Sequence, residues 1–371
     1  MLKILLCFGT RPEAIKMAPL FHELKKEKGF EVVVCVTAQH REMLDQVLDF
    51  FEIMPDFDLD IMQPNQTLNK LSATILNKID EVLEIVQPDL VLVHGDTTTS
   101  SMVALAAFHL GIKVGHVEAG LRSYNKQAPF PEEINRQFTS KLADFHFSPT
   151  VGATQNLLNE GVLRDDIQET GNTVIDALLW TIEKISKEGF LHPEIASLKK
   201  TLPKDKKVIL VTGHRRENYG IGFINVCNAL LTIATRDDVC VVYPVHLNPN
   251  VQDVVNERLA HQDNIYLIPP VSYPAFVWLM QQSFLILTDS GGIQEEAPTL
   301  GKPVLVTRTV SERPEGVAAG FSKIVGINQN EIENSICSLL DDFVVFDDNI
   351  NPYGDGTASL QIVNFLVNNY R

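Results

Sequence analysis

Three carboxylates follow short apolar runs in the first half of the sequence, where they could act as general acids or bases. They are Asp96, Glu118 and Glu132. Burial and the proximity of like charges raise the pKa of a carboxyl group toward the range in which it exchanges protons near neutral pH. Two alternatives stay open: Asp96 caps the helix that begins nearby, and Glu132, which follows a proline, favours a helix dipole.

A second set of residues has the chemistry of an anion site. Ser290, Gly291 and Gly292 follow an apolar run and precede a helix, so their backbone N–H groups can bind a diphosphate. Glu296, one turn further, is suited to hold a ribose diol through both carboxylate oxygens. The alternative is that Glu295 and Glu296 only favour the helix dipole.

Cations also gather where strands are expected to end, although the formal net charge of the chain is -16. They are Arg11, Lys16, His214, Arg215 and Arg313. An acidic protein that concentrates cations in this way indicates where an anionic ligand binds, while its overall field repels nucleic acid.

No cofactor is expected. The turn that contains Gly9 and Arg11 lacks the spacing of GxGxxG and of the P-loop, which removes the main support for a dinucleotide or ATP. His94, His116, Asp96 and Glu118 come from different predicted strands and lack HExxH-like spacing, so we expect no metal.

These residues need a scaffold that brings strand ends together. Short β-branched runs alternate with amphipathic stretches, which is typical of βα units and a parallel sheet. The pattern restarts: residues 3–11 align without a gap with residues 207–215, which places Gly9 on Gly213. The alternative is that any such strand needs a glycine where it turns into a helix.

We therefore predict an α/β protein of two Rossmann-like, doubly wound parallel-sheet domains that face a central cleft. The first domain spans residues 1–171 and is joined by the C-terminal helix 357–371, and the second spans 172–356. A polar connector at 198–207 precedes the second set of strands. Ligands bind outside the carboxyl ends of strands in such sheets.

Composition indicates a cytoplasmic protein. Five cysteines are an odd number without CxxC spacing, which favours a reducing compartment. We find no signal peptide, and no apolar run approaches the roughly 20 residues of a membrane span. We expect neither membrane nor nucleic-acid partners.

Several longer segments together resemble one family. They are Phe8–Lys16, Thr37–Gln46, Val93–Thr97, Gly115–Arg122, Gly171–Thr173, Gly213–Asn218, Thr288–Pro298, Glu312–Glu315 and Asn351–Gly356. In these segments the chain is similar to the bacterial non-hydrolysing UDP-N-acetylglucosamine 2-epimerases, whose fold is similar to that of GT-B glycosyltransferases. Val271 and the pair Val310-Ser311 depart from the family pattern, which affects nucleotide affinity rather than reaction type.

The resemblance implies an isomerase that converts UDP-GlcNAc to UDP-ManNAc for cell-surface polysaccharide synthesis. UDP leaves as the C2 proton is removed, and its readdition to the neutral 2-acetamidoglucal inverts C2. Alternatives are a hydrolysing 2-epimerase, a GT-B glycosyltransferase and a non-catalytic sensor of nucleotide sugars.

The resemblance also implies roles for individual residues. Asp96, Glu118 and Glu132 become the proton-transfer acids, supported by Arg136 and His214. The implied UDP-sugar site comprises Arg11, Lys16, Asp96, Glu118, His214, Val271, Phe276, Ser290, Gly291, Gly292, Glu296 and Arg313.

Two further expectations follow from the resemblance. Some members of the family are activated by a second UDP-GlcNAc, and the matching positions are Gln39, Gln66, Glu132, Arg215 and His246. The family and the apolar helix faces of the first half also indicate a homodimer.

Overall fold

The computed structural model describes residues 1–38, 41–63, 66–213, 220–309, 313–342 and 351–370. Its contacts divide the chain into two compact units. The first comprises Met1–Trp180 and Tyr353–Arg371, and the second comprises Thr181–Pro352. The division falls inside the helix α7 (Thr173–Ser186), whereas the sequence analysis placed it between residues 171 and 172. The returning segment begins at Tyr353 rather than at residue 357.

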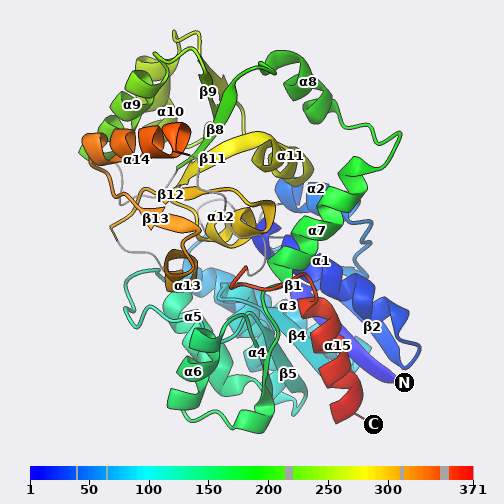
Figure 1. The fold of residues 1–371 in the computed structure, drawn as a ribbon. Coiled ribbons are helices and arrows are strands. Elements are labelled where there is room, and N and C mark those ends of the chain that lie inside the picture. Colours follow the sequence, from blue (N-terminus) through cyan, green and yellow to red (C-terminus); the bar gives the residue numbers. More distant parts are fainter. Residues whose placement is uncertain (39–40, 64–65, 214–219, 310–312, 343–350, 371) are drawn as a thin grey trace. The chain divides into compact units, whose positions relative to one another are not determined.

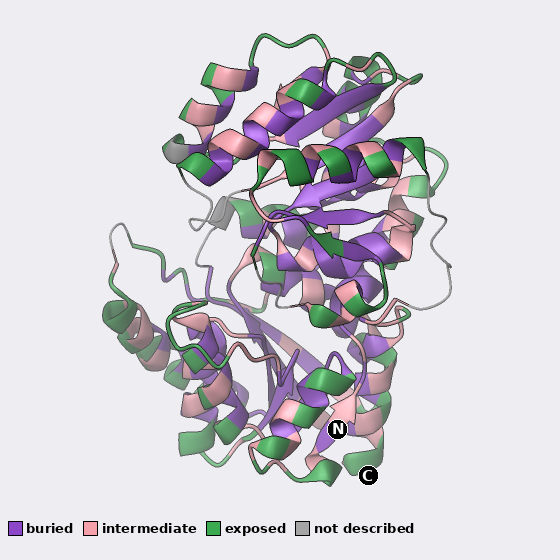
Figure 2. Cartoon of the chain, turned by 60° about the vertical axis from the view of Figure 1, so that its left-hand side comes forward, coloured by how far each residue is buried: buried purple, intermediate pink, exposed green. Residues whose placement is uncertain are grey.

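The first unit contains a parallel seven-stranded sheet in the order β3-β2-β1-β4-β5-β6-β7. Its strands are apolar and largely buried on both faces, as parallel strands between helices must be (Figure 2). They are β1 (Leu2–Phe8), β2 (Phe30–Val36), β3 (Phe57–Asp58), β4 (Leu90–His94), β5 (Lys113–Val117), β6 (Phe145–Ser148) and β7 (Ile167–Glu169).

Helices follow most of these strands, and four of them begin at a capping side chain. Thr10 and Glu13 form a capping box at the start of α1, and Thr67, Thr97 and Thr150 cap α3, α4 and α6. The helices are α1 (Arg11–Lys26), α2 (Arg41–Phe50), α3 (Leu68–Val86), α4 (Thr98–His109), α5 (Glu132–Leu142), α6 (Val151–Asn159) and α7 (Thr173–Ser186), with a 3₁₀ turn η1 (Arg164–Asp166).

The second unit repeats the plan with a parallel six-stranded sheet in the order β10-β9-β8-β11-β12-β13. Its strands are β8 (Lys207–Thr212), β9 (Val239–Pro244), β10 (Ile265–Ile268), β11 (Ser283–Thr288), β12 (Val304–Val306) and β13 (Ser322–Ile324). Its helices are α8 (Pro193–Thr201), α9 (Ile221–Ile233), α10 (Pro249–Leu259), α11 (Tyr273–Gln282), α12 (Gly291–Glu296), α13 (Pro314–Ala318) and α14 (Gln329–Asp341), with a 3₁₀ turn η3 (Ala297–Leu300).

Strand order reverses at one place in each sheet. In the first sheet β1 pairs with both β2 and β4, and in the second β8 pairs with both β9 and β11. Loops that leave neighbouring strands in opposite directions open a crevice at the carboxyl ends, which is where doubly wound sheets bind ligands. The predicted doubly wound, two-sheet fold is confirmed, and Asp96 and Ser290 each lie just beyond such a point.

The last helix, α15 (Ala358–Asn369), returns to the first unit and packs beside α1 (Figure 1). The ring of Phe365 meets those of Phe145 and Phe147 edge-on, with centroids 5.5 Å apart in both pairs. The Asp176 carboxylate accepts hydrogen bonds from the backbone of Ala358 and Ser359 and so caps this helix.

Three short edge strands, β3, β7 and β13, were not predicted from the sequence, and α8 occupies part of the segment expected to be a connector at 198–207. In none of the described ranges is a helix both long and apolar enough to cross a bilayer.

Candidate functional site

Glu118 is the centre of a polar network in the first unit. It follows β5 with a φ of 60°, an uncommon left-handed conformation for a residue with a side chain. Its side chain is only 5% exposed, and the Lys16 ammonium forms an ion pair with its Oε2 atom. Asn172 donates a hydrogen bond of 2.9 Å to the same oxygen. Glu118 is thus a buried carboxylate fixed by donors from distant parts of the sequence.

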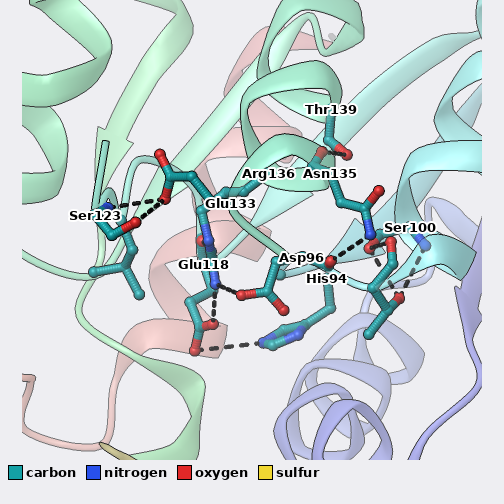
Figure 3. A network of polar contacts seen from close by, with 12 residues as sticks. His94, Asp96, Ser100, Glu118, Ser123, Glu133, Asn135, Arg136 and Thr139 are labelled. Carbon is teal, nitrogen blue, oxygen red and sulfur yellow. Dashed lines mark hydrogen bonds and ion pairs between the residues drawn. The ribbon is translucent and has the colours of Figure 1, made fainter. Parts of the chain in front are cut away.

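Arg136, on α5, joins Glu118 to Asp96. Its Nη2 atom lies 2.5 Å from Oδ2 of Asp96 and 3.2 Å from Oε1 of Glu118, and Nη1 donates to the Glu118 carbonyl (Figure 3). Burial alone would lower the pKa of Arg136, but the two carboxylates outweigh burial and raise it. The Asp96 side chain is 30% exposed, so it is the more accessible of the two acids.

Asp96 does not cap the following helix, as one alternative held. The residue that caps α4 is Thr97, whose side chain accepts a hydrogen bond from the backbone of Ser100. The Asp96 carbonyl instead accepts a 3.0 Å hydrogen bond from the Asn135 amide, which ties the β4–α4 turn to α5. Asp96 is therefore placed by α5 with its carboxylate turned to Arg136.

Two buried histidines adjoin these acids. His94 Nε2 lies 3.8 Å from Oε2 of Glu118, but burial lowers the pKa of His94 to about 4. Near neutral pH this contact is therefore not an ion pair. His116 bonds through Nε2 to the Gly95 carbonyl at 2.7 Å, and burial lowers its pKa too. Both rings present neutral polar groups to the network.

Glu132 and Glu133 open α5 and differ in their surroundings. Glu133 is buried and accepts hydrogen bonds from the Ser123 backbone and hydroxyl, the Tyr124 backbone and the Gln137 amide. Burial alone would raise the pKa of Glu133, but these hydrogen bonds outweigh it and lower the pKa. Glu132 is half-buried at the first position of the helix, which also fits the helix-dipole alternative.

The β1–α1 turn is organised by Glu13, a residue that the sequence analysis did not single out. One carboxylate oxygen accepts hydrogen bonds from the backbone of Gly9 and Thr10 and from the Thr10 hydroxyl, and the other accepts one from Thr97 at 2.7 Å. Burial raises the pKa of Glu13. The turn that bears Arg11 and the turn that bears Asp96 are joined by this side chain.

Asn172 was also missed as a site residue, although it lies within a segment that carries the family resemblance. It is fully enclosed, its amide oxygen accepts from the backbone of Val174 at 3.1 Å, and its backbone N–H donates to the Tyr353 carbonyl at 2.7 Å. A residue 54 positions from Glu118 in the chain could be linked to it only once the fold was known.

In the second unit, Ser290 precedes α12 as its N-cap, and Gly291 and Gly292 begin the helix. The Ser290 N–H donates to the Thr288 hydroxyl at 2.9 Å, and a Cβ atom placed on Gly292 would meet nothing within 4 Å. The Arg313 guanidinium lies beside Gly291, where a Cβ atom would come within 3.6 Å of Nη2. An open helix N-terminus and a cation therefore stand together, as an anion site requires.

The two acids that end α12 each have a specific partner. Glu295 is 1% exposed and forms an ion pair with Arg313, and Glu296 accepts a 2.7 Å hydrogen bond from the Tyr273 hydroxyl. Both lie in the last turn of the helix, where a negative charge opposes the dipole. The alternative that they only favour the dipole is wrong.

The remaining predicted positions are more scattered. Phe276 is half-buried on α11, Val271 is half-buried just before that helix, and His246 is exposed after β9. Gln66 precedes α3, and its amide nitrogen is enclosed with no hydrogen-bond partner among the described residues. Gln39, His214 and Arg215 lie outside the described residues, as does the departure Val310-Ser311.

Within the described ranges no group of three or more His, Cys, Asp or Glu side chains is arranged to hold a metal ion.

A profile of the UDP-N-acetylglucosamine 2-epimerase family matches residues 22–367. The chain belongs to this family.

Relatives of the epimerase family cover the chain throughout. It is 54% identical to the UDP-N-acetylglucosamine 2-epimerase of Escherichia coli O157:H7, over 99% of this chain and 99% of that protein. It is 51% identical to the UDP-N-acetylglucosamine 2-epimerase of Campylobacter jejuni, over 98% of this chain and 97% of that protein. As a family member it is an isomerase.

Solved structures of epimerases share the fold. The UDP-GlcNAc 2-epimerase from Neisseria meningitidis, bound to UDP-GlcNAc, has a TM-score of 0.93 at 49% identity and covers 99% of this chain and 100% of its own. The Methanocaldococcus jannaschii enzyme, in complex with UDP-GlcNAc and UDP, has a TM-score of 0.84 at 32% identity, with 99% of this chain and 100% of its own covered. The GT-B-like fold, with two parallel-sheet domains, is therefore shown.

Proposed function

We propose that this family member interconverts UDP-GlcNAc and UDP-ManNAc without net hydrolysis. The observation that carries the proposal is the pair of carboxylates, Asp96 and Glu118, held on one guanidinium at the carboxyl ends of β4 and β5. Two fixed acids at one strand-end crevice suit a reaction that takes a proton from one carbon and returns it to the same carbon. The epimerase from Neisseria meningitidis, which is bound to UDP-GlcNAc, supports the choice of substrate.

The physical problem of the reaction is the C2 hydrogen, which is not beside a carbonyl group. In the proposed elimination, a carboxylate takes the C2 proton, the C1–O bond breaks, and its electron pair leaves on the β-phosphate oxygen of UDP. The C1–C2 double bond of 2-acetamidoglucal forms, so the negative charge develops on a diphosphate and not on carbon. UDP then adds back to C1 while C2 is protonated on the opposite face.

Asp96, Glu118 and Glu132 are our proposed proton-transfer acids. Lys16 and Arg136 hold Glu118 in place. The positive charge of Arg136 also offsets the repulsion between the carboxylates of Asp96 and Glu118. His214, which belongs to the same proposal, lies outside the described residues.

The second unit supplies the proposed UDP site. Arg313 and the N-terminus of α12 would stabilise the departing diphosphate, and Glu296, oriented by Tyr273, would hold the ribose. Phe276 and Val271 would adjoin the uracil, with Arg11 completing the cationic set. We further propose that the bound glycal is shielded from water, since a released glycal would be lost to solvent.

Three wider proposals follow from family membership. The product would supply ManNAc for cell-surface polysaccharide synthesis in the cytoplasm, and the active species would be a homodimer. UDP-GlcNAc would activate the enzyme through Gln39, Gln66, Glu132, Arg215 and His246. Activation would be supported by a sigmoidal dependence of the rate on UDP-GlcNAc concentration, together with failure of pure UDP-ManNAc to react until UDP-GlcNAc is added. A hyperbolic dependence would contradict it.

Proton NMR of the purified protein with UDP-GlcNAc in D₂O tests the reaction, without added metal or nicotinamide. We expect UDP-ManNAc to accumulate with deuterium at C2. Free ManNAc with UDP would show the hydrolysing reaction instead. Unchanged substrate would contradict the epimerase proposal and favour a transferase or a sensor.

A further inference from the structure

The second unit contains a cavity of about 540 Å³ that the proposed reaction does not use. It lies between α8, the loop that follows this helix, the start of β8 and α11. Its lining residues are Lys199, Leu202, Pro203, Lys204, Lys206, Val208, Trp278 and Gln282. The volume falls within the range of small-molecule sites in proteins.

The cavity is separate from the proposed UDP site. Val208 is near the start of β8, and Gln282 immediately precedes β11. The predicted diphosphate turn at Ser290 follows the other end of β11, and a six-residue strand is roughly 17 Å long. The cavity therefore lies at the amino ends of strands whose carboxyl ends carry the proposed nucleotide-binding residues.

The charge of the cavity contrasts with that of the chain. Its lining includes three lysines and no carboxylate, although the chain carries a formal net charge of -16. Among the described residues, no carboxylate forms an ion pair with Lys199, Lys204 or Lys206. Lys206 donates to the neutral amide oxygen of Asn264 at 2.6 Å, so that contact leaves its charge uncompensated. Uncompensated cations around a concave site attract an anion.

The wall of the cavity also favours an aromatic group. Trp278 contributes its indole ring, and the Lys199 ammonium stands 5.9 Å from the ring centroid. Leu202, Pro203 and Val208 add apolar surface around it. A planar ring can pack against an indole that lines a cavity while a phosphate attached to it reaches the lysines.

We infer that this cavity is a second ligand site, for a small aromatic anion of the nucleoside diphosphate class. The ring of the ligand would lie against Trp278, and its phosphates would bind Lys199 and Lys204. The inference does not depend on the proposed epimerisation, because no residue of the cavity belongs to that machinery.

The chain has two tryptophans, Trp180 in the first unit and Trp278 in the cavity, so fluorine NMR of the 5-fluorotryptophan-labelled protein gives one signal for each. The probe is ADP. We expect ADP to shift the Trp278 signal saturably and leave the Trp180 signal in place, with adenosine or pyrophosphate alone binding more weakly. The variant Trp180→Phe removes one of the two signals and so assigns both. If Trp180→Phe does not fold, Trp278→Phe makes the same assignment.

Variants make the inference falsifiable. The double change Lys199→Ala with Lys204→Ala should weaken ADP binding about tenfold. Lys200→Ala, an exposed neighbour on α8 that does not line the cavity, is the matched control and should change nothing. Arg313→Lys, in the proposed UDP site, keeps the charge beside buried Glu295 and should leave the titration unaltered.

Three results would overturn the inference: no shift of the Trp278 signal at millimolar ADP, equal weakening by Lys200→Ala, or loss of the shift in Arg313→Lys. The last would mean that the signal reports the proposed UDP site. Failure of epimerisation in D₂O with a normal ADP titration would instead remove only the proposed function.

Discussion

The two units share a doubly wound plan but differ at the point where strand order reverses. Beyond β4 and β5 of the first unit, acids and cations neutralise one another, with Arg136 bound to both Asp96 and Glu118. Beyond β11 of the second unit, Gly292 leaves open space at a helix N-terminus and Arg313 stands beside it. The same fold thus provides a closed network of charges in one place and, in the other, an open helix N-terminus beside the Arg313–Glu295 ion pair.

Under our proposal this difference separates the chemistry into proton transfer by the first unit and leaving-group stabilisation by the second. Variants in the first unit should change the rate of the chemical step with little change in UDP affinity. Variants in the second should do the reverse.

The largest effect is expected for Glu118→Gln, which keeps the shape of the side chain but removes its ability to take a proton. Deuterium incorporation at C2 should slow about a thousandfold, as for loss of a general acid or base. UDP affinity, measured by calorimetry, should stay the same. Glu84→Gln, the same change at an exposed position of α3, is the control. A parallel loss of UDP affinity would contradict the separation.

The second largest effect is expected in the pH dependence of folding stability, which should differ between the two units. Because burial lowers the pKa of His94 to about 4, the unfolded chain binds more protons than the folded one between about pH 6.5 and 4. Stability is therefore lost as pH falls through that window, by about 2.5 kcal/mol from pH 7.5 to pH 4.5. The charged groups that surround His94 are Glu118, Lys16, Arg136 and Asp96.

His94→Gln should lose this contribution, so its stability should decline less than that of the wild type between the two pH values. Denaturant unfolding followed at Trp180, in the first unit, measures the difference. The same titration followed at Trp278, in the second unit, is the internal control. Identical pH dependence of the two proteins at Trp180 would show that His94 is not the group responsible.

Arg313→Lys should weaken UDP binding about thirtyfold, because an ammonium cannot reproduce the planar fork of a guanidinium. It keeps a positive charge beside buried Glu295, so the fold is preserved better than by alanine. Calorimetry with UDP gives the affinity, and circular dichroism checks the fold. Unaltered affinity would place the diphosphate elsewhere.

The smallest effect is expected for Asn172→Ala. This side chain orients Glu118 through one 2.9 Å hydrogen bond, so kcat should fall about tenfold while KM stays the same. Asn172→Ser, which retains a hydroxyl, should recover part of the rate. A rise in KM without a fall in kcat would show that Asn172 serves binding instead.

Much of the fold could be predicted because parallel strands bury both faces and appear as apolar runs. Strands β1, β2, β4, β5 and β6 follow this rule. The short edge strands β3 and β7 could not be predicted, since two or three residues carry no periodicity and pair only once a neighbour is in place.

Site residues were predictable where a strand ends, as at Asp96 and Glu118. The family resemblance also gave their shared partner Arg136, but their other partners were not predicted. Lys16 was assigned to the diphosphate, yet its ammonium forms an ion pair with Glu118, 102 residues away. Glu133 and Asn172 gave no separate signal, because a buried glutamate and an asparagine become part of a site only through tertiary contacts. Apart from Arg136, the sequence indicated the candidate acids but not the groups that hold them in place.

The return of α15 to the first unit also determines the order in which the chain can fold during synthesis. Residues Thr181–Pro352 leave the ribosome before Tyr353–Arg371, which complete the first unit. The second unit therefore has all its contacts while the first still exposes the surfaces of α1 and β6 that α15 will cover. The part of the protein translated first is the part completed last, and a premature stop codon in the final helix would damage the unit that bears Glu118.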